Sequence, residues 1–454
     1  MEPGDTAWVL SAAALVMFMT PGLGFFYAGF TRSKNVLATI MQSFIVVGLV
    51  GVLWVVVGYT LAFGPTEGGI IGNLEFFGFD DVGIVPSTTP VVGEVTWAPT
   101  IPHEAFAIFQ AMFAIITPAL ITGAFAERAK FSTFLVFMAL WSLLVYAPVA
   151  HWIFGAGWLG ITDPGGINAL DFAGGAAIHI NAGAAALAAA IFYGRRKGYG
   201  REPMEPHNVT YIVLGAAILW FGWFGFNAGS AGAANGQAAN AFVVTNTAAA
   251  AAALSWMFAS WALTGKASVI GAAAGAVAGL VAITPASGFV EPWASIIIGA
   301  VAGVVCYLAV RLRAVSGLDD SLDVVGVHGV GGTWGALATG IFATAAIGAG
   351  GPGTGVNGLI EGEASQVLDQ LAAIGVVWVY SFTVTAVILK VLDIVMGLRV
   401  SEEEEQMGLD VTQHGERGYV LEEASAVFVP PPAATPAPAP MAIPWTESAG
   451  SEAS

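Results

Sequence analysis

The chain has 454 residues, of which 56% are hydrophobic and only 10% are charged. Its mean hydropathy of +0.77 is typical of an integral membrane protein and excludes a water-soluble globule. The formal net charge of −17 argues against a nucleic-acid partner and would suit the acidic surfaces of a halophile. The single cysteine, Cys306, excludes a disulfide framework and a cysteine-rich zinc cluster.

Apolar windows of about 20 residues, the length that spans a bilayer, recur along most of the chain. We find eleven and expect each to be a membrane-spanning helix. They cover approximately residues 7–30, 36–63, 102–126, 131–154, 172–193, 208–229, 239–263, 267–284, 292–310, 324–346 and 367–396. The predicted fold class is an all-α polytopic membrane protein.

The positions of the basic residues predict the orientation, because Lys and Arg accumulate in cytoplasmic loops. All 14 of them, from Arg32 to Arg417, lie after odd-numbered spans, at the inner end of the last span or in the C-terminal tail. The connections after the even-numbered spans contain none. We therefore expect the N-terminus outside and the C-terminus inside.

The odd number of spans suggests two inverted five-helix halves followed by one extra helix, as in many transporters. Span 1 carries GFFYAG at its inner end, whereas span 6 carries GFNAG at its outer end. Asp171 and His179 of span 5 would correspond in the same way to Asp323 and His328 of span 10. The predicted fold is thus a five-plus-five inverted repeat with a final helix.

Beyond Val400 the composition changes to an acidic segment and then to a Pro- and Ala-rich segment. Such composition is typical of chain that does not form a packed core. We expect a transmembrane transport domain over residues 1–398, a cytoplasmic regulatory tail over 399–428, and a disordered Pro/Ala-rich end over 429–454.

Two of the six histidines, His179 and His328, lie deep in predicted spans. The helical rise places them about 12 Å from Asp171 and about 8 Å from Asp323, toward the middle of a hydrocarbon core about 30 Å thick. Ionisable side chains at that depth are costly and point to function. We expect both rings to line one pore. The alternative is two unrelated histidines, each bonded to a backbone carbonyl.

Burial removes the hydration of a charged imidazole, so we expect both rings to be neutral. A neutral pair can share one proton and offer its outer nitrogens to a hydrogen-bonding molecule. This chemistry favours a small, proton-bearing substrate over a dehydrated alkali cation. Asp171 and Asp323 are each placed to cap their own helix. A further role for Asp171 would be to attract a cation to the outer mouth.

Aromatic residues lie near the outer ends of spans 3 and 6, in AFAIFQAMFA and WFGFNAGSAG. Taken alone, such aromatic stripes are core packing. Taken with a histidine pair below them, two phenylalanines would form a steric gate. Ser230 would then lie just outside that gate as a hydrogen-bond acceptor for an entering cation.

The chain resembles the prokaryotic members of the ammonium transporter family, which includes the methylammonium permeases and the Rhesus glycoproteins. The matching segments are colinear to about residue 420 and include PGLGFFYAG, FQAMFA, LITGAFAER, LDFAGGAAIHINAG, WFGFNAGSAGAAN, VGVHGVGG and GLDVTQHGERGY. The resemblance implies a homotrimer in the cell membrane with one pore through each subunit. It also implies that the tail couples to a P-II-type nitrogen signalling protein.

Residue by residue, the resemblance implies that His179 and His328 are the paired pore histidines. Phe113 and Phe226 match the stacked phenylalanine gate. The substrate is then ammonium or ammonia, with methylammonium as an analogue. No cofactor and no metal is implied.

The resemblance also implies an outer recruitment site, with Phe109, Ser230 and Asp171 at matching positions. The family places a tryptophan after the AHxx run, where this chain has Phe154. Trp152 is close in sequence, but two residues' displacement turns a side chain by about 200° around a helix. We assign Phe154 to the recruitment site.

Other functions make different demands on the sequence. A sensor would bind ammonium and signal through the tail without flux. A divalent metal transporter would place carboxylates or thiols beside the histidines. A retinal pump would need a lysine deep in a span, and Lys390 lies near the inner end of the last one. The favoured interpretation is an ammonium transporter and not an enzyme.

Overall fold

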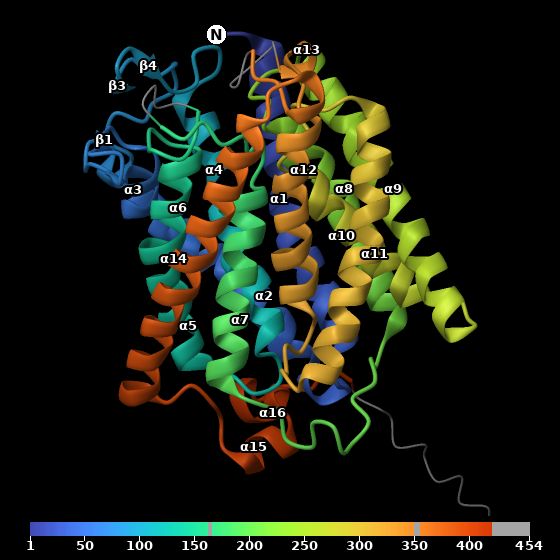
Figure 1. The fold of residues 1–454 in the computed structure, drawn as a ribbon. Helices are drawn as coiled ribbons and strands as arrows, with labels where there is room; N and C mark the ends of the chain where they lie inside the picture. Colours follow the sequence, from blue (N-terminus) through green and yellow to red (C-terminus); the bar gives the residue numbers. More distant parts are fainter. Residues whose placement is uncertain (162–165, 349–354, 420–454) are drawn as a thin grey trace, which may run out of the picture. The chain divides into compact units, whose positions relative to one another are not determined.

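The computed structural model describes residues 1–161, 166–348 and 355–419. The predicted Pro/Ala-rich end, 429–454, and the last part of the predicted tail lie outside these residues. Residues 1–418 form one compact unit. Figure 1 shows this unit as a bundle of helices, with short strands at one end and two short tail helices at the other.

Helices account for most of the described chain. The α-helices are α1 (Pro3–Phe30), α2 (Val36–Leu53), α3 (Tyr59–Phe63), α4 (His103–Ile121), α5 (Phe131–Trp141), α6 (Ala147–Ile153), α7 (Asn181–Tyr193), α8 (Val209–Gly229), α9 (Gly236–Thr264), α10 (Val269–Ile283), α11 (Pro292–Ser316), α12 (Val330–Phe342), α13 (Ala345–Gly348), α14 (Ser365–Met396), α15 (Glu402–Met407) and α16 (Leu409–His414). The strands are β1 (Thr66–Glu67), β2 (Ile71–Gly72), β3 (Pro90–Val92) and β4 (Val95–Thr96), which pair antiparallel as β1–β2 and β3–β4.

Within the described residues, four π-helical turns join or precede these helices: η2 (Trp54–Gly58), η5 (Ser142–Tyr146), η6 (Gly175–Ile180) and η7 (Val325–Gly329). Short 3₁₀ turns cover Ser33–Asn35, Phe77–Phe79, Thr122–Ala124 and Leu359–Glu361. A π turn widens the helix and is found preferentially at functional sites. Two of the four, η6 and η7, each carry one of the two deep histidines.

The predicted apolar windows coincide with helices or with continuous runs of them. Within the described residues, nine helices or runs are long and apolar enough to cross a membrane. The two remaining windows correspond to α10, an apolar helix of 15 residues, and to the run from η7 to α12. The chain is therefore a multi-pass helical membrane protein.

Small residues bring the helices close together. α1 packs along α8, and α9 packs along both α10 and α11 (Figure 1). A Cβ atom on Gly215 of α8 would overlap the backbone nitrogen of Phe26 in α1, so a larger residue could not occupy this crossing. Close backbone approach at small residues is the usual basis of packing between membrane helices.

The two ends of the bundle differ. We call the end that carries the connection 64–102 and both strand pairs the loop end, and the opposite end, which carries α15 and α16, the tail end (Figure 1). At the tail end, Asp410 Oδ1 accepts the Ala38 backbone N–H at 2.8 Å. The Leu409 N–H donates to Asn35 Oδ1, also at 2.8 Å. The tail is thus bound to the start of α2.

Candidate functional site

Asp171 fixes the first of the two histidine-bearing turns. Its Oδ1 accepts the N–H groups of Gly174 and Gly175 at 2.8 and 2.6 Å, and its Oδ2 accepts those of Ala176 and Ala177 at 2.8 and 3.0 Å. Burial raises the pKa of Asp171, while these four donors stabilise the charged carboxylate. The carboxylate therefore caps η6, the turn that carries His179.

Asp320, and not Asp323, has the matching role at the second turn. Asp320 Oδ2 accepts the Val325 N–H, the first of η7, at 2.8 Å. The prediction that Asp323 caps this helix is wrong, because the backbone of Asp323 is left-handed, with φ 60°, and its side chain pairs with Arg313 at 2.7 Å. Asp320 precedes His328 by eight residues, as Asp171 precedes His179. That equal spacing is the signal that sequence reasoning missed.

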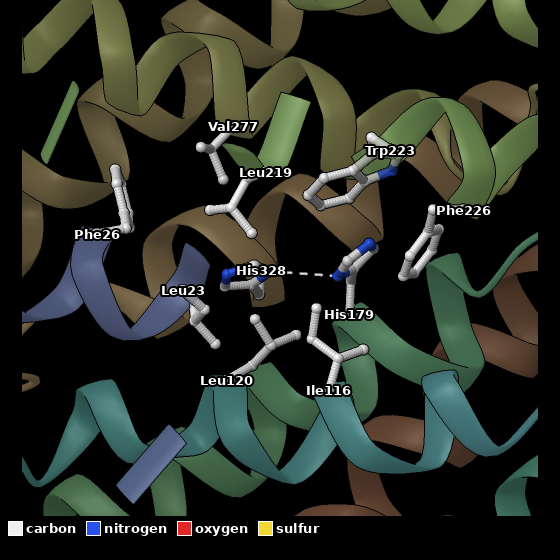
Figure 2. Close-up of a pocket in the computed structure, with 10 residues that line it drawn as sticks. All are labelled: Leu23, Phe26, Ile116, Leu120, His179, Leu219, Trp223, Phe226, Val277 and His328. Carbon is white, nitrogen blue, oxygen red and sulfur yellow. Dashed lines mark hydrogen bonds between the residues drawn. The ribbon is translucent and has the colours of Figure 1, made fainter. Parts of the chain in front are cut away.

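Two glycines allow the histidine-bearing segments to meet. A Cβ atom on Gly183 of α7 would overlap the Cα and nitrogen atoms of Gly329 in η7. The absence of side chains at this crossing brings His179 and His328 together in the middle of the bundle. Their Nδ1 atoms lie 3.2 Å apart, and their ring centroids lie 5.3 Å apart (Figure 2).

The two rings share one hydrogen bond. One Nδ1 must donate and the other accept, because two protonated or two bare nitrogens would repel each other. The rings are 1% and 4% exposed. A neutral pair with a single proton between the facing nitrogens fits this geometry. Each ring is then oriented by the other, and not by a backbone carbonyl.

A small apolar cavity surrounds the pair. It measures about 10 Å³, close to the space that one water molecule needs. Besides the two imidazoles, its walls are hydrophobic side chains: Leu23, Phe26, Ile116, Leu120, Leu219, Trp223, Phe226 and Val277 (Figure 2). The Nε2 atom of His179 is buried and has no hydrogen-bond partner within the described part of the chain. A small hydrogen-bonding molecule would find a free polar atom here.

Two phenylalanines close this cavity toward the loop end. The rings of Phe113 and Phe226 lie 4.6 Å apart at an interplanar angle of 64°. Both are buried, and the ring of Phe226 lies 6.0 Å from that of His179 in a stacked orientation. Phe226 lines the histidine cavity and Phe113 lines a second pocket, so the two rings lie between these spaces.

This second pocket, the loop-end pocket, has a volume of about 560 Å³. Among the predicted site residues, Phe113, Phe154, Asp171 and Ser230 line it. Ser230 Oγ donates to the Phe226 carbonyl at 2.8 Å, which leaves its lone pairs as acceptors. Phe109 packs behind Phe113, with the two ring centroids 4.9 Å apart.

The structure distinguishes Phe154 from Trp152. Trp152 Nε1 donates to the Ile70 carbonyl at 2.7 Å, and its ring packs on Tyr380 at 4.5 Å. Phe154 also packs against the cluster that contains Trp152, but of these two residues only Phe154 lines the loop-end pocket. Two residues along a helix turn the side-chain direction by about 200°, and this rotation accounts for the difference.

Sequence reasoning missed four further aromatic residues of the pocket, the pair Trp97 and Phe106 and the pair Phe172 and Phe289. The rings of Trp97 and Phe106 are stacked, with centroids 5.5 Å apart and an interplanar angle of 12°. Trp97 follows strand β4, in a connection without helical periodicity. The sequence shows Trp97 as a single aromatic residue just before a span, but no pattern in it predicts that the side chain lines the pocket.

The chain is similar in sequence and in fold to known proteins. The Ammonium Transporter Family matches residues 7–419. An ammonium transporter of Bacillus subtilis is 49% identical over 420 residues, which cover 92% of this chain and 99% of that protein. The crystal structure of Candida albicans Mep2 is 36% identical, with a TM-score of 0.81 over 93% of this chain and 94% of the other. A structure described as a sensor Amt protein is 28% identical, with a TM-score of 0.80 over 90% and 98% of the two chains. The chain belongs to the ammonium transporter family.

Proposed function

We propose that this protein recruits ammonium in the loop-end pocket and conducts ammonia through the cavity that holds His179 and His328. The observation that carries the proposal is the imidazole pair, which lies behind two phenylalanine rings in a cavity of about 10 Å³. Membership of the family supports ammonium as the substrate.

The lining of the cavity favours the neutral species. Ammonium carries four N–H donors, whereas the cavity offers the nitrogens of two imidazoles among apolar side chains. An ion without partners in such surroundings pays a large desolvation cost. Ammonia needs fewer partners, and the free Nε2 of His179 can hydrogen-bond to it. The proton is then handled separately from the nitrogen.

The membrane arrangement belongs to the same proposal. Eleven spans place the loop end outside and the tail end inside the cell membrane, and the subunits form a homotrimer. The tail, 399–428, acts as a regulatory segment for a P-II-type nitrogen signalling protein, while residues 1–398 transport. Cysteine labelling tests the orientation: a cysteine at Thr89 should react from outside and one at Gly198 should not.

Flux into liposomes tests transport, with ammonium compared against potassium. His179→Ala and His328→Ala should each abolish ammonium flux or abolish discrimination against potassium. His207→Ala is the matched control, because this histidine bonds the Thr31 carbonyl at the tail end, away from the cavity. If both cavity variants kept the flux and selectivity of the wild type, the histidines would be structural.

A sensor is the second candidate function. The fold similarity to a sensor Amt protein and the bound tail favour it. A sensor would bind ammonium and change the protection of the tail from proteolysis, but it would show no flux in the same liposomes. A metal-ion transporter has less support, since the neighbours of the two imidazoles are apolar and aromatic side chains.

A further inference from the structure

We propose that Thr284 is a positioning residue for the histidine pair. It holds the indole of Trp223 against the imidazole of His179, and this contact keeps the Nδ1 atom of His179 turned toward His328. The inference rests on the proposed function, because it concerns a ring in the cavity that conducts ammonia. Thr284 itself follows the last residue of α10 and lines neither this cavity nor the loop-end pocket.

His179 has few polar contacts that fix its ring. Its Nδ1 lies 3.2 Å from the Nδ1 of His328, and its Nε2 has no hydrogen-bond partner among the described residues. The torsion that turns an imidazole about its Cβ–Cγ bond is broad, with two favoured states. A half-turn about this bond would replace Nδ1 by a carbon atom and break the hydrogen bond to His328. The ring therefore needs a further contact to stay in the observed orientation.

Trp223 supplies this contact. Its ring lies against the imidazole of His179, with centroids 5.4 Å apart and an interplanar angle of 26°. Figure 2 shows Trp223 and Phe226 beside His179, with Phe226 on the side away from His328. In a densely packed interior, an imidazole that lies against an indole cannot rotate unless the indole moves. The position of Trp223 therefore determines the orientation of His179.

Thr284 fixes the position of Trp223. The indole Nε1 donates to Thr284 Oγ1 at 2.9 Å, and this hydroxyl donates its own proton to the Leu280 carbonyl at 2.7 Å. Its proton is thus used within α10, and a lone pair is directed to the indole. Both side chains are buried, at 2% exposure for Trp223 and 0% for Thr284. Without the hydroxyl, the indole N–H would be left buried and unpaired.

The connection after α10 is a fixed support for this hydroxyl. The Pro285 carbonyl accepts the Phe172 N–H at 3.1 Å, and the Gly288 carbonyl accepts Gln237 Nε2 at 2.9 Å. The Pro285 ring also occupies the space that a Cβ atom on Gly175, the first residue of η6, would need. The connection is therefore bound to other elements and packs directly on the turn that carries His179.

Ammonium flux into liposomes with the full-length protein tests the role of the hydroxyl. Thr284→Val keeps the shape of the side chain but removes the acceptor, and the maximal rate should fall about tenfold, as for one lost hydrogen bond. The half-saturating concentration should stay close to that of the wild type, because Thr284 does not line the loop-end pocket. Thr284→Ser keeps a hydroxyl and should keep the rate. A wild-type rate in Thr284→Val would overturn the proposal.

A double variant shows whether Thr284 acts through the indole. Trp223→Phe keeps an aromatic ring beside His179 but has no N–H to donate. Thr284→Val should therefore cause no further loss in the Trp223→Phe background, since the two changes remove the same hydrogen bond. If Thr284→Val does not fold by itself, Trp223→Phe removes this bond from the other side. A full additional loss in the double variant would show that Thr284 acts elsewhere.

The matched control is Thr385→Val, which removes the same kind of bond in another part of the bundle. Trp141 Nε1 donates to Thr385 Oγ1 at 2.9 Å, and both side chains are buried. Neither residue lines the histidine cavity. Thr385→Val should lower the melting temperature about as much as Thr284→Val but keep the ammonium flux. An equal loss of flux in both variants would assign the effect to stability alone and overturn the positioning role.

Solid-state nitrogen NMR of the full-length protein, isotopically labelled in its histidines and embedded in lipid, observes the ring without relying on flux. The His179 signals are those that disappear in His179→Ala. They should split or broaden in Thr284→Val as the ring leaves its single orientation, and stay sharp in Thr284→Ser and Thr385→Val. If these signals change as expected but the wild type shows no ammonium flux, only the proposed function is refuted. Normal flux with unchanged signals in Thr284→Val would refute only the positioning role.

Discussion

The turns η6 and η7 are both capped by an aspartate, but they lie in different surroundings. Each carries a buried histidine eight residues after a capping aspartate. Asp171 lies among aromatic side chains at the loop end and binds four backbone amides. Asp320 lies at the tail end, beside a network of buried ion pairs. One turn therefore borders the loop-end pocket, whereas the other lies among charged residues of the tail end.

The ion-pair network begins at Arg128, which is fully buried and donates to the Asp319 carbonyl at 2.7 Å. Arg196 pairs with Asp319 at 2.9 Å and with Glu127 at 3.3 Å. Burial alone would raise the pKa of Glu127, but Arg196 and Arg32 hold it below its ordinary value. The loop that carries Asp320 is therefore fixed through charges on three connections.

The same network reaches the tail. Glu405 of α15 accepts the Lys197 N–H at 2.6 Å and pairs with Arg399 at 2.6 Å. Arg399 also donates to the carbonyls of Tyr193 and Arg195, which lie at and just beyond the end of α7. Since His179 is carried by η6 and α7 continues from it, the tail contacts the C-terminal end of the helix that holds this histidine.

Breaking the ion-pair network should have the largest effect on the free energy of unfolding. Glu127→Ala leaves Arg196 and Arg32 without their shared carboxylate. Removing one partner of a buried ion pair costs about 3–5 kcal/mol, so the free energy of unfolding should fall by that amount. Thermal unfolding in detergent measures it, with the exposed Glu75→Ala as control. Equal melting temperatures for the two variants would contradict a structural role for the network.

The tail-end turn should make the stability of the protein depend on pH. Burial and the neighbouring Asp323 carboxylate raise the pKa of Asp320 to about 7, against about 4 in an unfolded chain. Between these values the folded protein binds more protons than the unfolded one, so stability should fall as pH rises from about 4 to about 7. The expected change is at most about 4 kcal/mol.

Asp320→Asn should remove the contribution of Asp320 to this pH dependence, because the amide does not titrate, while Asp171, whose pKa is also raised, keeps its own contribution. Melting temperatures measured at several pH values in this range would show it as a flatter profile. Asp80→Asn, at an exposed position of the loop end, should keep the profile of the wild type. The interpretation fails if Asp320→Asn keeps that profile too.

The capping aspartates should differ in their effect on stability. Asp171→Ala removes an acceptor for four amides and should cost about 2 kcal/mol, at the upper end of the range for helix caps. Asp320→Ala, measured at pH 7, should cost less. It removes fewer hydrogen bonds than Asp171→Ala, and it relieves the repulsion between Asp320 and Asp323. The two unfolding free energies give the comparison directly. A larger loss for Asp320→Ala would reverse the roles of the two turns.

The smallest effect concerns Phe154 in the loop-end pocket. Phe154→Trp should lower the half-saturating ammonium concentration, because indole offers a stronger cation–π surface. The expected gain is about 0.5–2 kcal/mol. Trp152→Phe is the control, since that indole is bound to the Ile70 carbonyl outside the pocket. If only Trp152→Phe changed the affinity, the recruiting aromatic would be Trp152.

The sequence by itself determined the class of the protein and the position of its helices. The length of an apolar window and the cost of an ionisable group at membrane depth are local properties. They identified the windows that became helices, and they singled out His179 and His328. The family resemblance then connected these residues with ammonium.

Only the tertiary structure decided which side chains share a site. The left-handed backbone at Asp323 turns its carboxylate to Arg313 and leaves Asp320 to cap η7. Trp97 and Phe106 stack on each other because the connection after β4 folds over the start of α4. Side-chain direction in a loop depends on contacts with distant elements, and a sequence pattern does not contain them. The meeting of the two histidines likewise required the glycine crossing between α7 and η7.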